Sequence, residues 1–325
     1  MKLRNRKVLV TGCAGFVGSH MTDRLLALGN TVLGIDNFST GKRSFLEKAC
    51  SSDRFDLIGG DLLSMDLAPF LDGVEVLCHF AANPDVRVGA SDTRVHFQQN
   101  LEVTYRLLEA ARENGVKDFV FPSTSTVYGE PDTMPTPETF GPLVPISLYG
   151  ASKLGCEALV SGYCHTFDMS SVIYRFANVV GSRSTHNVLH DFVRKLRQNP
   201  KELEILGREP GTSKSYVHID DCLEGMIIGA EKADEQVEIL NIGSKDRATV
   251  KEIADIVVEG LELKEVRYRW TGGVDGGRGW TGDVRQMLLS VERLERLGWR
   301  PRYSSSEAIA AAVREIIVEK SYDVS

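Results

Sequence analysis

The stretch Val8–Ser19, VLVTGCAGFVGS, decides the fold of this chain. Its first three residues form an apolar run that predicts a buried strand, and the pattern after Ser19 predicts a helix. Between them, three glycines recur at every third position. Gly12 permits a tight turn, Gly15 lets a ligand's diphosphate approach the backbone, and Gly18 lets the helix pack closely on the strand. This order of strand, glycine turn and helix N-terminus is typical of a dinucleotide site.

Further short apolar runs follow at regular intervals along the chain. The runs are continuous rather than alternating, which is expected of parallel strands buried on both faces, and helical patterns lie between them. One helical pattern contains Leu101, Tyr105 and Leu108, with Gly115 as its expected stop. The sequence therefore predicts an α/β fold with a doubly wound parallel sheet. The predicted strands are Val8–Val10, Thr31–Ile35, Phe55–Ile58, Val76–Phe80, Phe119–Phe121, Ser171–Tyr174 and Val237–Asn241.

The pattern weakens from Gly181 onward, and all three tryptophans fall in the last quarter of the chain. We therefore predict a nucleotide-binding domain over residues 1–178, to which residues 216–244 return as a helix followed by a strand. Residues 179–215 and 245–325 are predicted to form a smaller mixed α/β cap domain that binds the substrate.

Composition limits the classes of function. The chain has 325 residues, of which 42% are hydrophobic, and a formal net charge of −7, so no basic surface for nucleic acid is expected. No run of about 20 apolar residues predicts a membrane span. The apolar run Val8–Val10 after the basic start is also too short for a signal peptide, so a cytoplasmic location is expected. The six cysteines form no C-x-x-C pair, which favours reduced thiols. His186 and His190 lack an evident third ligand, so no metal site is expected.

An acidic residue follows the second predicted strand. Asp36 lies 18 residues after Gly18, where a carboxylate reads the hydroxyls of an adenosine ribose. The same carboxylate would repel a 2′-phosphate, so NAD is favoured over NADP, although Lys42 and Arg43 weaken that preference. Asp61 and Phe80-Ala81-Ala82 follow the next two strands, at the edge where such sheets bind ligands.

A tyrosine and a lysine stand four residues apart after the fifth predicted strand. If the segment from Tyr149 opens a helix, Tyr149 and Lys153 project from one face. An ammonium beside the phenol, with a positive nicotinamide ring close by, would lower the phenol's pKa from about 10 toward neutrality. Tyr149 is then a candidate general base.

These motifs together resemble the extended short-chain dehydrogenase/reductase family, whose fold is a Rossmann-type sheet with a cap. The resemblance rests on the three glycines, on Asp36, on the hydroxyl-rich run Ser123–Gly129 and on the Tyr149/Lys153 pair, and it covers essentially the whole chain. Within the family the chain is most similar to UDP-glucose 4-epimerases. The resemblance implies an NAD-dependent enzyme that acts on a UDP-sugar, with a homodimer in which Leu101, Tyr105 and Leu108 contribute to a helical interface or to the core.

The resemblance also implies roles for individual residues. The implied catalytic residues are Thr124, Tyr149 and Lys153. The implied cofactor-binding residues are Gly12, Gly15, Phe16, Val17, Gly18, Asp36, Asn37, Ser39, Thr40, Gly41, Asp61, Leu62, Phe80, Ala81, Ala82, Asn100, Ser123, Tyr149, Lys153 and Phe176. The implied substrate-binding residues are Pro84, Thr124, Ser125, Tyr149, Asn178, Arg183, Lys214, Arg278, Asp283 and Met287, with Arg278 as the candidate diphosphate clamp.

Departures from the family pattern define the alternatives. Lys214-Ser215 replaces a common arginine–aspartate pair, and Ser125-Thr126 replaces the acidic pair with which related dehydratases eliminate water. Elimination is therefore disfavoured, and reversible oxidation at the sugar C4 remains. Met287 stands near the position that limits space around C2, so N-acetylated sugars are also predicted substrates. A UDP-uronate epimerase or decarboxylase, a keto-sugar reductase and a non-catalytic NAD sensor or scaffold remain as alternatives.

Overall fold

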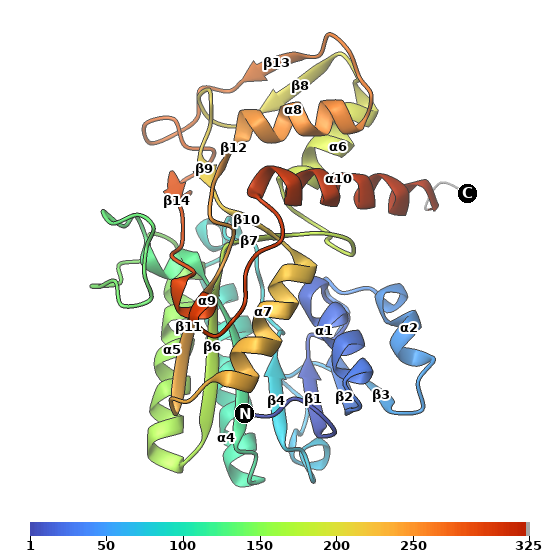
Figure 1. Ribbon diagram of the computed structural model, residues 1–325, viewed down its shortest axis with the longest axis vertical. Coiled ribbons are helices and arrows are strands. Elements are labelled where there is room, and N and C mark those ends of the chain that lie inside the picture. The colour runs from blue at the N-terminus through green and yellow to red at the C-terminus, as the bar shows by residue number, and fades with distance from the viewer. Residues whose placement is uncertain (323–325) are drawn as a thin grey trace.

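The computed structural model describes residues 1–322, and the lower half of the molecule is built on one parallel sheet (Figure 1). The sheet has seven strands in the order β11-β6-β5-β4-β1-β2-β3, all paired in parallel. This confirms the predicted doubly wound sheet, and each predicted run lies in a strand except for Phe80, which follows β4. The strands are β1 (Lys7–Thr11), β2 (Thr31–Asp36), β3 (Phe55–Gly59), β4 (Val76–His79), β5 (Asp118–Thr124), β6 (Ser170–Phe176) and β11 (Val237–Ile242).

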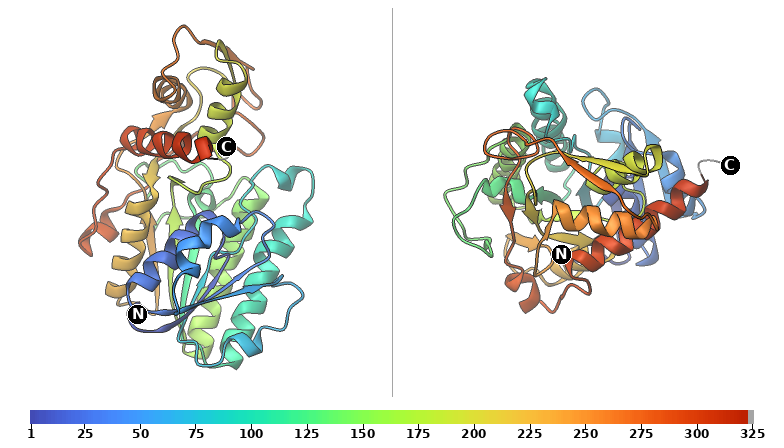
Figure 2. Two further views of the ribbon diagram at one scale, coloured as in Figure 1. Left: turned by 90° about the vertical axis from the view of Figure 1, so that its right-hand side faces the viewer. Right: turned by 90° about the horizontal axis from the view of Figure 1, so that it is seen from above.

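Helices cover both faces of this sheet (Figure 2). On one face, α1 (Phe16–Ala27), α7 (Ile219–Lys232) and α9 (Glu292–Arg296) contribute to a core that includes Met21, Met226 and Trp299. On the other face, α4 (Val103–Glu113) and α5 (Leu148–Phe167) contribute to a second core. Burial on both faces explains why the strands read as continuous apolar runs.

The helix that precedes β5 is longer than its α4 segment. It begins as α3 (Arg94–His96), continues through a π-helical segment, η4 (Phe97–Glu102), and runs into α4. Gly115 follows its end with φ of +72°, a conformation that suits glycine. Leu108 is fully buried, whereas Tyr105 is 48% exposed, so only part of the predicted apolar face packs into the core.

A smaller body of mixed helices and strands sits over the upper end of the sheet (Figures 1 and 2). Its core lies between α6 (Val188–Gln198), α8 (Val250–Gly260) and α10 (Ser305–Tyr322), with the parallel pair β8 (Glu202–Ile205) and β13 (Arg267–Trp270) beside them. Short strands connect the two bodies: β7 (Asn178–Val180), β9 (Ser213–Lys214), β10 (Tyr216–His218), β12 (Ala248–Thr249) and β14 (Gln286–Met287). The remaining short elements are η1 (Arg43–Leu46), α2 (Glu47–Cys50), η2 (Ala68–Phe70), η3 (Val88–Ala90) and η5 (Ser125–Tyr128).

The predicted domain limits stay a prediction, and residues 323–325 of the predicted cap lie outside the described residues. Two segments differ in detail from the description predicted for them. The segment predicted to return as a helix at Tyr216 begins as strand β10, and its helix starts at Ile219. Leu294 and Trp299, which were assigned to the cap, pack against α7 in the core of the large sheet. Within residues 1–322, no helix has the length and apolar character needed to cross a membrane.

The packing of Trp299 generates a stability prediction. Its ring is 1% exposed, lies against Gly225 of α7 and donates a hydrogen bond of 2.9 Å to the Asp221 carbonyl. We expect Trp299→Ala to lower the free energy of unfolding by about 3–5 kcal/mol, because a large buried side chain is lost and a cavity remains. Urea denaturation measures this loss. Val318→Ala, at a position that is 57% exposed, should change stability by less than about 0.5 kcal/mol. A Trp299 variant as stable as the control would contradict the packing argument.

Candidate functional site

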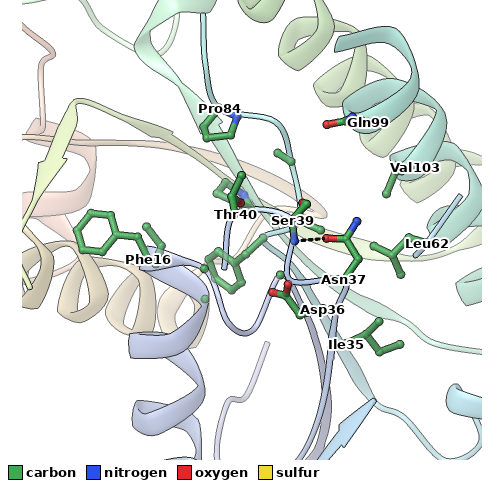
Figure 3. Close-up of a pocket in the computed structure, with 18 of the residues that line it drawn as sticks. Phe16, Ile35, Asp36, Asn37, Ser39, Thr40, Leu62, Pro84, Gln99 and Val103 are labelled. Carbon is green, nitrogen blue, oxygen red and sulfur yellow. Dashed lines mark hydrogen bonds between the residues drawn. The ribbon is translucent and has the colours of Figure 1, made fainter. Parts of the chain in front are cut away.

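A cavity of about 420 Å³ opens at the carboxyl edge of the large sheet (Figure 3). The ends of β1, β2, β3, β4, β5 and β6 all contribute to it, as do the first turns of α1 and α5. This is the edge where doubly wound sheets bind ligands. The lining residues are Gly12, Gly15, Phe16, Val17, Gly18, Ile35, Asp36, Asn37, Ser39, Thr40, Gly60, Asp61, Leu62, Leu63, Phe80, Ala81, Ala82, Pro84, Gln99, Val103, Pro122, Ser123, Tyr149, Lys153 and Phe176.

The glycine turn forms one wall of the cavity and leaves no room for side chains. Gly12 has φ of +69°, and a Cβ there would lie 2.5 Å from the amide nitrogen of Ala81. A Cβ on Gly18 would lie 2.1 Å from the carbonyl oxygen of Gly12. The turn therefore presents bare backbone and the N-terminus of α1 to the cavity, which is a suitable environment for a diphosphate.

Asp36 is buried at the end of β2, and its carboxylate organises the neighbouring backbone. The amide of Ala14 donates to Oδ2 at 2.8 Å, and the amide of Phe38 donates to Oδ1 at 2.7 Å. Each carboxylate oxygen keeps a further acceptor position. Since Asp36 also lines the cavity, these positions are available to ribose hydroxyls.

The loops after β2 and β3 contribute Asn37, Ser39, Thr40 and Leu62 to the lining of the cavity (Figure 3). Asn37 accepts a hydrogen bond from the Ser39 amide at 3.0 Å and donates to Asp61 at 3.3 Å. The guanidinium carbon of Arg43 lies 4.0 Å from the centre of the Phe38 ring. This cation is therefore near the β2–β3 edge, as its place in the sequence suggested.

The Tyr149/Lys153 pair lies on the first turns of α5, as the spacing predicts. Ser147 caps this helix by accepting a hydrogen bond from the Gly150 amide at 3.1 Å. Both side chains reach the cavity, and the Lys153 ammonium lies 4.2 Å from the centre of the Phe121 ring. Thr124, at the end of β5, interacts with the Tyr149 phenol through its hydroxyl.

Burial dominates the electrostatics of this pair. Burial raises the pKa of Tyr149 to about 12, and the Thr124 hydroxyl acts in the opposite direction. Burial also lowers the pKa of Lys153 to about 8, although Cys156 and Glu157 favour its charged form. Removal from water therefore disfavours the phenolate, and the predicted lowering of this pKa beside a positive nicotinamide ring stays a prediction.

Three positively charged residues that are predicted to bind substrate lie outside the cavity lining, and each of them pairs with a carboxylate. Lys214 pairs with Asp283 at 2.5 Å. Arg278 forms two contacts of 2.8 Å with Glu130 and lowers the pKa of that carboxyl to about 2. Arg183 pairs with Asp23 of α1 at 2.9 Å, which holds it against that helix.

The other substrate-side positions have varied surroundings. Pro84 lines the cavity, and Ser125 begins the turn η5 that follows Thr124. Asn178 donates to the Ser215 carbonyl at 3.0 Å. Met287 is only 5% exposed and packs in the core of the large sheet. The surroundings of this side chain therefore add no support to the predicted acceptance of N-acetylated sugars.

Gly41 and Asn100, which are predicted to bind the cofactor, do not line the cavity but support segments next to it. Gly41 packs on the Ala14 backbone, where a Cβ would lie 2.8 Å from the carbonyl carbon. Asn100 is buried, accepts a hydrogen bond from the Asn83 amide at 2.8 Å and donates to Ser152 at 3.0 Å. It therefore supports the loop after β4.

The sequence analysis missed lining residues that have no distinctive chemistry. Gln99 and Val103 reach the cavity from the π-helical segment and the start of α4, and no pattern in the sequence predicts a π-helix there. Four other lining residues could have been predicted, because each is next to a predicted residue at a strand end: Ile35, Gly60, Leu63 and Pro122. Among residues 1–322, no cluster of three or more metal-ligating side chains is present, and His190 contacts Ser184.

Comparison with known proteins agrees with this geometry. The sequence pattern of the NAD-dependent epimerase/dehydratase family matches residues 8–243. An uncharacterised UDP-glucose epimerase of Bacillus subtilis is 37% identical over 262 residues, covering 77% of this chain and 81% of the relative. A UDP-glucose 4-epimerase of Mycolicibacterium smegmatis is 30% identical over 315 residues, covering 94% of this chain and 97% of the relative.

Solved structures show the same likeness. A crystal structure of a UDP-galactose 4-epimerase is 38% identical with a TM-score of 0.85, covering 96% of this chain and 99% of the other. A UDP-glucuronic acid 4-epimerase from Bacillus cereus, solved with UDP-glucuronic acid and NAD, is 30% identical with a TM-score of 0.86 and the same coverage.

The crowded glycine turn generates a binding prediction. We expect Gly18→Ala to weaken NAD binding about tenfold or more, because the added Cβ would displace the Gly12 carbonyl and the turn that faces the diphosphate, and a loss of about 1.4 kcal/mol is tenfold in affinity. Calorimetric titration of the cofactor-stripped protein measures this change. The matched control is Gly162→Ala on the exposed face of α5, where a Cβ would meet no atom within 4 Å. Equal NAD affinity in the two variants would show that the close approach is not needed.

Proposed function

The chain belongs to the NAD-dependent epimerase/dehydratase family and is an NAD-dependent sugar-nucleotide epimerase, and from this premise we propose that it interconverts UDP-glucose and UDP-galactose at C4. The observation that carries the proposal is that Tyr149 and Lys153 line the dinucleotide cavity and that Thr124, which is outside the lining, contacts the Tyr149 phenol. Ser125 and Thr126 follow Thr124, so the turn offers hydroxyls where elimination would need a carboxylic acid.

The residues present fit NAD. Gly12 and Gly18 leave a cradle that a Cβ would fill, which suits the diphosphate. Asp36 would hold the adenosine ribose through its remaining acceptor positions, and its negative charge favours NAD over NADP. Lys153 would donate to the nicotinamide ribose from the α5 side of the cavity.

The side chains then have distinct tasks in epimerisation. Tyr149 takes the proton from the C4 hydroxyl, and Thr124 holds that hydroxyl beside the phenol. NAD, when bound, would supply a reversible hydride acceptor for C4 and a positive charge that favours the phenolate of Tyr149. After the sugar has presented its other face, Tyr149 would return the proton to the C4 oxygen. The reaction leaves no net redox change.

The arrangement of charges favours a neutral sugar over a uronic acid. A uronate would need a cation near C6, but Arg183, Lys214 and Arg278 each have a carboxylate partner. A second carboxylate would have to displace that partner. A UDP-glucuronic acid 4-epimerase of the same fold has nevertheless been solved, so the assay must include a UDP-uronic acid as the alternative substrate class.

We also propose that the protein works as a homodimer in a reducing compartment, the cytoplasm. Large apolar side chains are exposed on η4, α4 and the end of α5: Phe97 is 59% exposed, Tyr105 48% and Phe167 40%. Exposed apolar surface of this kind marks interaction sites. The six cysteines are free thiols, five of them buried, which suits a reducing compartment.

The assay that tests the proposed function uses purified protein, UDP-galactose and no added NAD, with proton NMR of the anomeric signals. Conversion to UDP-glucose is expected. Tyr149→Phe should lower turnover about 100-fold or more by removing the proton donor and acceptor, while the protein retains NAD. Tyr163→Phe is the matched control on the same helix, since its hydroxyl contacts Glu109 and not the cavity. Wild-type turnover in Tyr149→Phe would defeat the mechanism.

The substrate class and the non-catalytic alternative are separated by the same assay. Conversion of UDP-glucuronic acid but not of UDP-galactose would move the function to the uronate class. NAD binding without turnover of any UDP-sugar would favour the sensor or scaffold.

The dimer proposal generates its own prediction. Tyr105→Arg places a charge in the exposed apolar face of α4, so the molar mass measured by light scattering should fall from that of a dimer to that of a monomer. Val318→Arg on α10, which is 57% exposed on the upper body, is the control and should leave the mass unchanged. A monomeric wild-type protein would refute the dimer.

A further inference from the structure

Three polar side chains lie beside one another across neighbouring strands next to the catalytic groups. Ser123 of β5 is in register with Arg175 of β6, and Arg175 is in register with Asn241 of β11. Each is at most 3% exposed. We call these three residues the transverse polar row. Buried polar groups are destabilising unless their hydrogen bonds are satisfied, so the partners of this row decide its effect.

The first partner comes from the helix that carries the Tyr149/Lys153 pair. Glu157 lies one turn beyond Lys153 and two turns beyond Tyr149, so all three share one face of α5. Arg175 donates to both carboxylate oxygens of Glu157, at 3.1 Å from Nε and 2.7 Å from Nη2. The Ser123 hydroxyl donates a short hydrogen bond to the same carboxylate. The Glu157 and Arg175 side chains are 5% and 4% exposed.

The other end of the row holds the turn that follows Thr124. Nη1 of Arg175 donates to the Tyr128 hydroxyl at 3.0 Å, and that hydroxyl donates to Oδ1 of Asn241 at 2.8 Å. Asn241 in turn donates to the carbonyl oxygens of Thr136 and Ser290, each at 3.0 Å. The turn η5 is therefore held at its far end by the same guanidinium that binds α5.

We propose that Glu157 and Arg175 are positioning residues for the epimerisation, which hold Tyr149 and Lys153 of α5 in register with Thr124 of β5. Neither residue lines the cavity. The ion pair joins the element that carries the general base to the strand that carries the hydroxyl it works with. A displacement of about 1 Å between such groups costs about 100-fold in rate. The inference rests on the proposed function for its chemistry and adds to it the residues that keep the site in register.

Two variants separate positioning from stability. Glu157→Gln keeps the shape of the side chain but leaves the Arg175 charge uncompensated. The double variant Glu157→Leu/Arg175→Met removes both charges, and replacing a buried ion pair by apolar residues of similar size is often neutral for stability. In both variants we expect kcat to fall about tenfold or more, with KM within about twofold and NAD content unchanged, because the displaced groups act in the chemical step. In the double variant, the melting temperature should return close to that of the wild type.

The matched control is a second buried carboxylate, which lies in the large sheet and not on α5. Glu238 of β11 is 3% exposed and pairs with Arg293 of α9 at 2.8 Å, so this ion pair joins neither α5 nor β5. Glu238→Gln should lower the melting temperature and leave kcat unchanged. A loss of kcat in this control equal to that of Glu157→Gln would show that general destabilisation explains the effect, and the proposal would fall.

The outcomes decide the proposal in each case. A double variant with wild-type melting temperature, bound NAD and low kcat supports positioning, whereas full kcat in that protein overturns it. If the double variant does not fold, Arg175→Lys replaces it, since lysine keeps the charge but loses the two-pronged contact, and wild-type kcat there overturns the proposal. Every kcat is compared with that of the wild type on the UDP-sugar that the wild type converts. Failure with UDP-galactose therefore counts against the proposed substrate and not against the positioning pair.

Discussion

The structure depends on a place where no side chain fits, between the turn after β1 and the first turn of α1. A Cβ on Gly18 would overlap the Gly12 carbonyl, and a Cβ on Gly12 would overlap the backbone that follows β4. Three backbone segments converge there because β1 lies beside β4 in the sheet and α1 starts at once. This convergence exposes backbone and a helix N-terminus at the carboxyl edge, and the other strand ends then bring Asp36, Ala81 and Ser123 around the same cavity.

A second constraint acts on the reacting groups, because burial moves their two pKa values apart, that of Tyr149 up to about 12 and that of Lys153 down to about 8. The phenol of Tyr149 becomes a weaker acid and the ammonium of Lys153 a stronger one, since the low-dielectric surroundings favour the neutral form of each. Ligand charge therefore has a large influence on the protonation of this pair. Among the predicted substrate-binding residues, the positive charges of Lys214 and Arg278 are each compensated by a carboxylate of the protein itself.

Much of the architecture was predictable from local pattern. The seven strands of the sheet are short apolar runs buried on both faces, and such runs are visible in one dimension. Tyr149 and Lys153 share a helix face because four residues make about one turn. Gln99 and Val103 were missed because a π-helical segment shifts the angular position of each following residue. Arg183 was predicted for the substrate, but its contact with Asp23 depends on how α1 lies against the upper body.

The sequence by itself determined the order of the elements, the dinucleotide turn, the acidic residue after β2 and the tyrosine–lysine pair, because each depends on residues within a few turns or within one strand. Only the tertiary structure decided which charges are buried together. Glu157 and Arg175 are 18 residues apart, and Arg278 and Glu130 are 148 apart, so no local pattern relates them. The pKa values of Tyr149 and Lys153 are likewise set by desolvation, which depends on every segment packed around them and which no spacing along the chain records.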